Sequence, residues 1–94
     1  MTPYKIFETE NFRKELRLLI PSREQTLIQR KMKNLVFPRL REQPHFGNHI
    51  KKLKNYEPES WRYRIGDFRI FYSIDEKEKV VVLTAIRWRK DAYR

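Results

Sequence analysis

WRYRIGDFRIFYSIDEKEKVVVLTAIR, residues 61–87, carries the pattern that decides the fold. Apolar and basic side chains alternate at its start, and this period of two is typical of a strand with two different faces. Gly66-Asp67 then supplies a two-residue hairpin turn, and a second polar loop follows at 75–78. The stretch therefore predicts a three-stranded antiparallel meander with strands at 61–65, 68–74 and 79 to about 87.

The hairpin turn sets which residues face each other across the first two strands. Arg64 lies opposite Arg69, and Tyr63 lies opposite Ile70. One face of the meander is then apolar and receives Trp61, Tyr63, Ile65, Phe68, Ile70, Tyr72, Ile74, Val81 and Leu83. The opposite face receives Arg62, Arg64, Arg69, Phe71, Thr84 and Ile86.

The second face is predicted to bind an anion. The acidic residues of this third of the chain fall in turns or near its end, so none balances the arginines. A like-charge cross-strand pair such as Arg64 and Arg69 costs up to about 1 kcal/mol unless an anion neutralises it, and a phosphate would serve. Phe71 beside Arg62 offers a flat ring for a base or for a partner protein. The alternative interpretation is a set of arginines spread into solvent.

Two amphipathic helices are predicted before the meander, after a short extended run at 4–7. The first opens at Asn11 and ends at Pro21, with apolar residues at helical spacing at Phe12, Leu16, Leu19 and Ile20. The second begins at Ser22, which together with Gln25 matches a capping box. Its apolar stripe comprises Leu27, Ile28, Met32, Leu35 and Val36.

Pro38 limits the second helix, because proline has no backbone N–H to donate. The helix either ends near Val36 or kinks there before Leu40. Residues 43–60 are rich in proline, glycine and asparagine, and we expect a loop that carries Lys51, Lys52 and Lys54. The predicted fold class is α+β, with two N-terminal helices packed on a small, mainly antiparallel sheet, in one domain over residues 1–94.

The composition favours a polyanionic partner. The 94 residues include 22 Lys and Arg against 12 Asp and Glu, a formal net charge of +10 that attracts nucleic acid before any specific contact forms. A solvated cationic surface is the alternative. Cysteine is absent and there are only two histidines, so we expect neither a metal site nor a cofactor. No stretch has the apolar length of a signal peptide or membrane span, so we expect a cytoplasmic protein without a membrane partner.

The stretch WRYRIGDFRIFYSIDEKEKVVVLTAIRWRKDAYR, residues 61–94, closely resembles the C-terminal half of the RelE/ParE superfamily of type II toxins, particularly the RelE-like mRNA interferases. The most specific features are the strand-GD-strand hairpin with its flanking arginines and the ending Arg-Lys-Asp-x-Tyr. The resemblance extends more weakly over the helices and Ile50-Lys51-Lys52-Leu53. It implies a toxin that enters the ribosomal A site and cuts mRNA there without a metal, using the 2′-hydroxyl as nucleophile. Its implied partners are a cognate antitoxin, the ribosome and mRNA, with operator DNA reached through the antitoxin complex.

The resemblance also implies which residues carry the reaction. The catalytic set is Arg62, Arg64, Arg69, Arg89 and Tyr93. The residues expected to bind RNA are Lys51, Lys52, Lys54, Phe71, Arg87 and Lys90. Without the resemblance, the cluster of cations and aromatics at 87–94 also fits a basic tail with no chemistry.

The chain departs from the family pattern at two places. Arginine stands at 62 and 64, where active relatives commonly have lysine, and Arg87-Trp88 stands where many relatives have Gly-His. Arginine is a poor general base, so its role is electrostatic and the base is not identified. His45 and His49 are the candidates for it in the preceding loop. Two other functions stay open: a ParE-like inhibitor of DNA gyrase, and a degenerate toxin that binds nucleic acid as a corepressor with its antitoxin.

Overall fold

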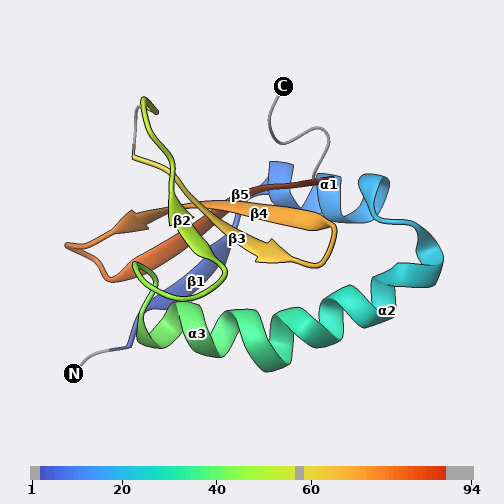
Figure 1. Ribbon diagram of the computed structural model, residues 1–94, viewed down its shortest axis with the longest axis horizontal. Coiled ribbons are helices and arrows are strands. Elements are labelled where there is room, and N and C mark those ends of the chain that lie inside the picture. The colour runs from blue at the N-terminus through green and yellow to red at the C-terminus, as the bar shows by residue number, and fades with distance from the viewer. Residues whose placement is uncertain (1–2, 57–58, 89–94) are drawn as a thin grey trace.

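The computed structural model describes residues 3–56 and 59–88. The strands of its single five-stranded sheet lie in the order β1-β5-β4-β3-β2, and the helices are placed between β1 and β2 along the chain (Figure 1). The elements are β1 (Lys5–Glu8), α1 (Glu10–Leu19), α2 (Ser22–Lys31), η1 (Met32–Val36), α3 (Phe37–Glu42), β2 (Ile50–Lys52), β3 (Trp61–Ile65), β4 (Phe68–Asp75) and β5 (Val80–Trp88).

The predicted meander is confirmed and is extended at both edges. Arg64 pairs with Arg69 and Tyr63 with Ile70, as the hairpin turn predicts, and Gly66 has the positive φ of 60° that suits this turn. β2 pairs antiparallel with β3, although its residues were expected to lie in a loop. β1 pairs parallel with β5, so the sheet is mixed but mainly antiparallel.

The alternation fails at one point, because β5 contains a bulge. Phe71 pairs with Ala85 whereas Tyr72 pairs with Leu83, so Thr84 is an extra residue and its Oγ1 donates to the Phe71 carbonyl at 3.2 Å. An extra residue moves every following side chain to the other face. Ile86 therefore lies with the core and is fully buried, which corrects its predicted place beside the arginines.

The helix that contains Pro38 continues through it. Figure 1 shows α2, η1 and α3 as one unbroken helical segment. The turns before the proline are wider than α-helical, and Phe37 N donates to Met32 O, five residues back. A π-type turn of this kind makes room for the proline ring and for its missing N–H. The helix therefore ends at Glu42 and not near Val36.

The predicted capping box does not form. Ser22 is already the first residue of α2. The N-cap of this helix is Pro21, whose side chain makes no capping hydrogen bond. Gln25 instead turns back to the preceding helix, where its Nε2 donates to Leu16 O at 2.6 Å and to Ile20 O at 3.0 Å. These bonds satisfy carbonyl groups that the C-terminal end of α1 leaves unpaired. The N-cap of α1 is Thr9, whose side chain accepts from Phe12 N.

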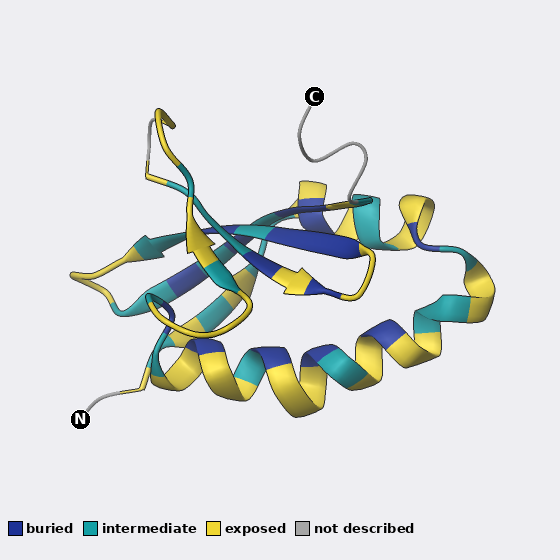
Figure 2. Ribbon diagram, viewed as in Figure 1, coloured by how far each residue is buried: buried dark blue, intermediate teal, exposed yellow. Residues whose placement is uncertain are grey.

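The core lies between the long helical segment and one face of the sheet, hereafter the helix-facing side (Figure 2). Ile28, Met32, Val36 and Leu40 supply the helical half, while Leu27 and Leu35 of the predicted stripe are 48% and 59% exposed. The sheet supplies Tyr63, Ile65, Phe68, Ile70, Tyr72, Val81, Leu83 and Ile86. The opposite face of the sheet, hereafter the outer face, is the one on which the predicted arginines lie.

Candidate functional site

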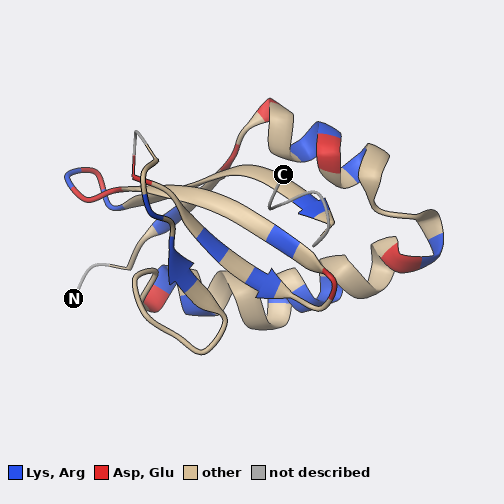
Figure 3. Ribbon diagram, turned by 45° about the horizontal axis from the view of Figure 1, so that its top comes forward, with Lys and Arg blue, Asp and Glu red and all other residues tan. Residues whose placement is uncertain are grey.

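Three arginines lie side by side across the outer face, one on each of three neighbouring strands. Arg64 on β3 is the partner of Arg69 on β4, and Arg69 is the partner of Arg87 on β5. We call these residues the arginine row. Figure 3 shows basic segments on adjacent strands of this part of the sheet. The bulge at Thr84 brings Arg87 into the row, because it shifts the face that the end of β5 presents.

A second row runs beside the first. Lys51 on β2 is the partner of Arg62 on β3, which in turn is the partner of Phe71 on β4. The Phe71 ring is half-buried and stands next to Arg62, as the sequence predicted. The two rows together carry five basic side chains and one aromatic ring on paired strands, where their relative positions are fixed by backbone pairing.

Arg69 is the least accessible member of the arginine row, since only 5% of its surface is exposed. Its Nη1 donates to Phe68 O at 2.9 Å and to Gly66 O at 3.1 Å. Its Nε is buried and has no hydrogen-bond partner among the described residues, and the same is true of Arg62 Nε. A buried donor without an acceptor costs about 1–3 kcal/mol, and more on a charged group. Arg62 and Arg69 are therefore not simply spread into solvent.

Within the described part of the chain the two rows have one acidic partner, and the sequence did not predict it. Glu15 of α1 places its Oε2 3.1 Å from Arg87 Nε. No other carboxylate of residues 3–56 and 59–88 lies within ion-pair distance of Lys51 or of the arginines of the two rows. This ion pair involves Arg87, a residue that the predicted anion-binding face did not include.

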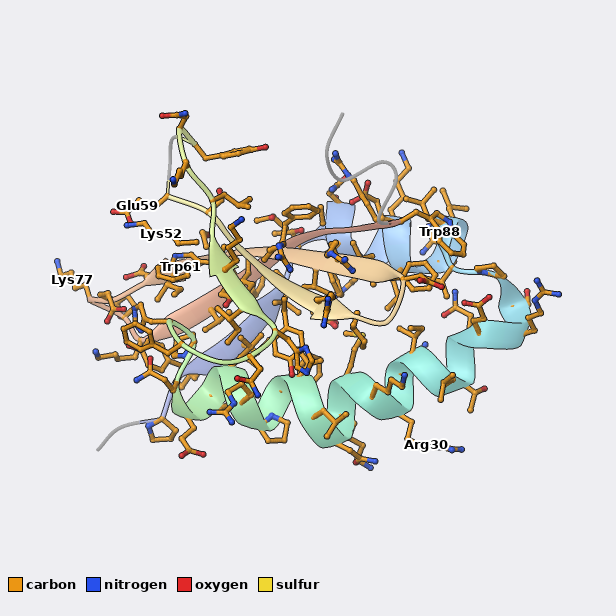
Figure 4. All side chains as sticks on the ribbon, viewed as in Figure 1. Arg30, Lys52, Glu59, Trp61, Lys77 and Trp88 are labelled. Atoms are coloured by element: carbon orange, nitrogen blue, oxygen red, sulfur yellow. The ribbon has the colours of Figure 1, made fainter. Side chains whose placement is uncertain are left out.

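The lysines predicted to bind RNA are divided between the two faces. Lys51 lies on the outer face, but Lys52 is the partner of Trp61 and lies on the helix-facing side. Lys52 Nζ is 5.6 Å from the centre of the Trp61 ring and 2.5 Å from a carboxylate oxygen of Glu59. Figure 4 shows these three side chains together at one end of the molecule, far from Trp88. Lys54 follows β2 in an exposed turn.

Neither histidine lies in the arginine row. His45 packs edge-on against Trp61 at 5.3 Å between ring centres, and its Nε2 contacts Glu76. The His49 ring lies 5.8 Å from the ring of Tyr63, a residue of the core. Both rings are thus on the helix-facing side or at its border. Within the described part of the chain, no three histidine or acidic side chains are grouped in a way that could hold a metal ion.

Three predicted site residues, Arg89, Lys90 and Tyr93, lie outside the described residues. The last described residue is Trp88, whose ring packs at a tilt against Phe68 with 4.3 Å between centres and an interplanar angle of 36°. Trp88 therefore belongs to the helix-facing side, and Arg87 before it belongs to the outer face.

Two side chains bridge helix and sheet or helix and helix, and neither contact was predicted from the sequence. In the sequence Glu15 looks like an ordinary polar helix residue, because its partner Arg87 is distant along the chain. Gln25 matches a capping box there, and this match hides its bonds to the preceding helix. The pairing of Lys51 with Arg62 could not be predicted from the sequence either. A three-residue strand with two lysines shows no clear alternation of apolar and polar side chains.

Comparisons with known proteins give similar chains over most of the length. The sequence profile of the family described as "ParE toxin of type II toxin-antitoxin system, parDE" matches residues 8–93. The structure of the toxin-antitoxin complex RelBE2 from Mycobacterium tuberculosis contains a chain with 26% identity and a TM-score of 0.71, covering 95% of this chain and 94% of that chain. No curated protein matches the sequence significantly.

Two more distant structures share the fold. A mutant of the E. coli toxin RelE in the free state has 17% identity and a TM-score of 0.67, covering 96% of this chain and 87% of that chain. A RelE-RelB complex from Pyrococcus horikoshii OT3 has 24% identity and a TM-score of 0.55, covering 95% and 97%. No helix within the described residues is long and apolar enough to cross a membrane.

Proposed function

The chain belongs to the ParE toxin family of type II toxin-antitoxin systems, within the RelE/ParE superfamily, and we propose that this toxin is a ribosome-dependent endoribonuclease. As such a toxin it has a cognate antitoxin as partner. In the proposed activity it enters the A site of the ribosome, cuts mRNA there and stops translation. Operator DNA is a further proposed partner, reached through the complex with the antitoxin.

The observation that carries this proposal is the unsatisfied state of Arg64 and Arg69 in the arginine row. Arg69 is buried with a free Nε, and Arg64 beside it is exposed with no carboxylate near it in the described chain. Two adjacent guanidinium groups repel each other, and they gain most from a ligand with several anionic oxygens in fixed positions. A phosphodiester has this geometry, and Phe71 lies two pairs further along the same strands, on the same face, to stack a base.

The proposed reaction needs no group beyond the RNA and the protein. The 2′-oxygen attacks the adjacent phosphorus, the bond from phosphorus to the 5′-oxygen breaks, and the 2′-proton leaves to a base while the 5′-oxygen gains a proton. The products end in a 2′,3′-cyclic phosphate and a 5′-hydroxyl. Arg62, Arg64 and Arg69 would stabilise the charge that develops on the phosphate oxygens, because guanidinium groups stay charged at neutral pH.

We assign the remaining roles from the family resemblance. Arg89 would stabilise the phosphate and the leaving 5′-oxygen, and Tyr93 would orient the nucleotide with its hydroxyl near the 2′-oxygen. Lys51, Arg87 and Lys90 would hold neighbouring phosphates. Lys52 is a weaker candidate for phosphate binding than Lys51, because it already contacts Glu59 and Trp61 on the other side of the sheet.

Purified ribosomes carrying a defined mRNA test the proposal directly. We expect the wild-type protein to cut the mRNA only when it is on the ribosome, and to leave 2′,3′-cyclic phosphate ends. Arg69→Gln should slow cutting at least about tenfold, equal to 1.4 kcal/mol of transition-state stabilisation. Arg23→Gln removes the same charge from an exposed helix position whose side chain is 87% accessible, and it should cut normally. Equal cutting by the two variants would contradict the assignment of Arg69.

A second function is favoured by the family match itself, whose description names the ParE toxin. In that case the protein would inhibit DNA gyrase and leave mRNA intact. A supercoiling assay with purified gyrase separates the two, since the proposed ribonuclease should leave gyrase activity unchanged. A protein that affects neither mRNA nor gyrase but binds operator DNA with its antitoxin would be the degenerate corepressor.

A further inference from the structure

The end of β5 is bordered by α1 where β1 stops. β1 pairs with β5 only from Val80 to Leu83. Beyond that point Asn11 Nδ2 donates to Thr84 O at 2.8 Å, and Glu15 Oε1 accepts from Ile86 N at 3.2 Å. Side chains of α1 therefore replace the missing strand and satisfy backbone groups that an open sheet edge would expose.

Glu15 does more than satisfy that edge, because its carboxylate accepts from three donors. Besides Ile86 N, its Oε1 accepts from Asn11 Nδ2 at 3.0 Å and its Oε2 accepts from Arg87 Nε at 3.1 Å. The Glu15 side chain is only 16% exposed, whereas the Arg87 side chain is 47% exposed. The carboxylate is thus held in place by α1 and β5, and Arg87 is the more exposed partner of the pair.

We infer that Glu15 is an internal counter-ion of the arginine row and competes with bound phosphate for Arg87. This inference rests on the proposed function, because it assumes that the row binds a phosphate. In the free protein Glu15 draws the Arg87 side chain away from Arg69 toward α1, which reduces the repulsion along the row. A phosphate held by Arg64 and Arg69 must compete with a fixed carboxylate before it recruits the third arginine.

Glu15 therefore sets how selective the site is. A loosely bound polyanion does not displace a carboxylate that is already positioned, whereas a phosphate fixed between two guanidinium groups does. The cost of this arrangement is a lower affinity for RNA in general. Removing the charge of Glu15 should consequently make binding tighter and less selective, which is the opposite of what loss of a purely structural residue would do.

The first experiment compares Glu15→Gln with Glu10→Gln. Both variants remove one negative charge from α1, but Glu10 is exposed at its first turn and contacts no arginine in the described structure. Glutamine at 15 keeps a carbonyl oxygen to accept from Ile86 N. The ligand is a short single-stranded 2′-O-methyl oligonucleotide, which the proposed reaction cannot cleave, and binding is measured between about 50 and 200 mM salt.

We expect Glu15→Gln to bind the oligonucleotide about two- to fivefold more tightly than Glu10→Gln, as removal of a half-exposed ion pair predicts. The slope of log affinity against log salt should also steepen by about 0.7, the value for one further phosphate contact on a single strand. Equal affinities, or weaker binding by Glu15→Gln, would overturn the inference.

A second measurement uses the wild-type chain, and it remains decisive if Glu15→Gln does not fold. The Nε–H signals of Arg69 and Arg87 are followed by NMR as the oligonucleotide is added. Both signals should shift, since Arg87 moves from Glu15 to the phosphate. A shift of Arg69 alone would contradict the inference and leave the proposed function intact. If neither signal shifts, the arginine row does not bind RNA and the proposed function itself fails.

Discussion

The two faces of the β3–β4 hairpin have the same backbone and opposite surroundings. Tyr63 and Ile70 pair on the helix-facing side and are 7% and 0% exposed. The next pair, Arg64 with Arg69, stands on the outer face with an unsatisfied donor and uncompensated charge. The helix-facing side therefore stabilises the fold, whereas the outer face lowers stability through its unpaired donor and repelling charges. The packed helix-facing side also keeps the arginines of the outer face in fixed positions.

The largest effect should come from the helix-facing side. Ile70→Ala leaves a cavity at a fully buried position, and we expect it to lower the free energy of unfolding by about 2–5 kcal/mol. Phe71→Ala, one residue away on the half-buried outer face, should cost less. Urea denaturation of both variants measures the difference. An Ile70→Ala protein with an unchanged midpoint would mean that the two faces behave alike.

Tyr72→Phe tests a single polar contact inside the same core. Burial raises the pKa of Tyr72, so its hydroxyl stays protonated and donates to Pro44 O at 2.7 Å. Without this donor the Pro44 carbonyl stays buried and unsatisfied, at a cost of about 1–3 kcal/mol. Thermal unfolding should show a reduced melting temperature. Stability equal to that of the wild type would show that water replaces the hydroxyl.

A truncation at Tyr93, which lies beyond the described residues, tests whether cleavage by the outer face depends on the residues after β5. Deletion of residues 93–94 removes the proposed orienting hydroxyl. We expect the truncated protein to fold and to bind antitoxin, yet to cleave mRNA at least about tenfold more slowly, or roughly 1.4 kcal/mol. Single-turnover cleavage on ribosomes measures this rate. Undiminished cleavage would remove Tyr93 from the mechanism.

On the outer face itself, loss of a basic side chain should affect binding and spare the fold. Arg64→Ala relieves repulsion with Arg69, so we expect stability to be unchanged or to rise by up to about 1 kcal/mol. The salt slope of RNA binding should fall by about 0.7 as one phosphate contact is lost. An Arg64→Ala protein that unfolds, or that keeps its full salt slope, would refute the claim that the outer face binds RNA while the helix-facing side stabilises the fold.

The smallest effect concerns the turn between β4 and β5, away from the arginine row. Hydrogen bonds from Lys79 and then Tyr4 hold the pKa of Glu76 below its ordinary value of 4.5. A lowered pKa in the folded state means that Glu76 stabilises the protein above pH 4.5, and that this contribution is lost as the pH falls through the folded value.

Glu76→Gln is therefore expected to be less stable than the wild type at pH 7 by a few tenths of a kcal/mol, on the order of an exposed ion pair. This difference should vanish in acid. Chemical denaturation of both proteins at neutral and acidic pH measures it. A difference that stays constant with pH would show that the carboxylate charge contributes nothing.

Much of the fold could be predicted from the sequence, because its strongest signals are local. The alternation at 61–65 and the Gly66-Asp67 turn are local patterns, and together they predicted the register of β3 with β4 correctly. The bulge at Thr84 could not be predicted, since an extra residue in a run of valine, leucine and threonine changes no local preference. Ile86 was misplaced for this reason alone.

The candidate site was predicted less completely, because parts of it depend on contacts between distant segments. Arg62, Arg64 and Arg69 follow from the alternation, whereas the place of Arg87 depends on the bulge. Glu15 is 72 residues from Arg87 and joins it only after α1 packs along β5. The continuation of the helix through Pro38 likewise required a wider turn that no local rule favours.

Mapping of mRNA ends in cells tests the central claim most directly, namely that the arginine row of the outer face cuts mRNA on the ribosome. Wild-type protein, Arg69→Gln and the control Arg23→Gln are each induced briefly, and new 5′-hydroxyl ends are sequenced. The account predicts cuts within translated codons for the wild type and Arg23→Gln, and almost none for Arg69→Gln. Growth arrest without such cuts, accompanied by gyrase-dependent DNA breaks, would contradict it.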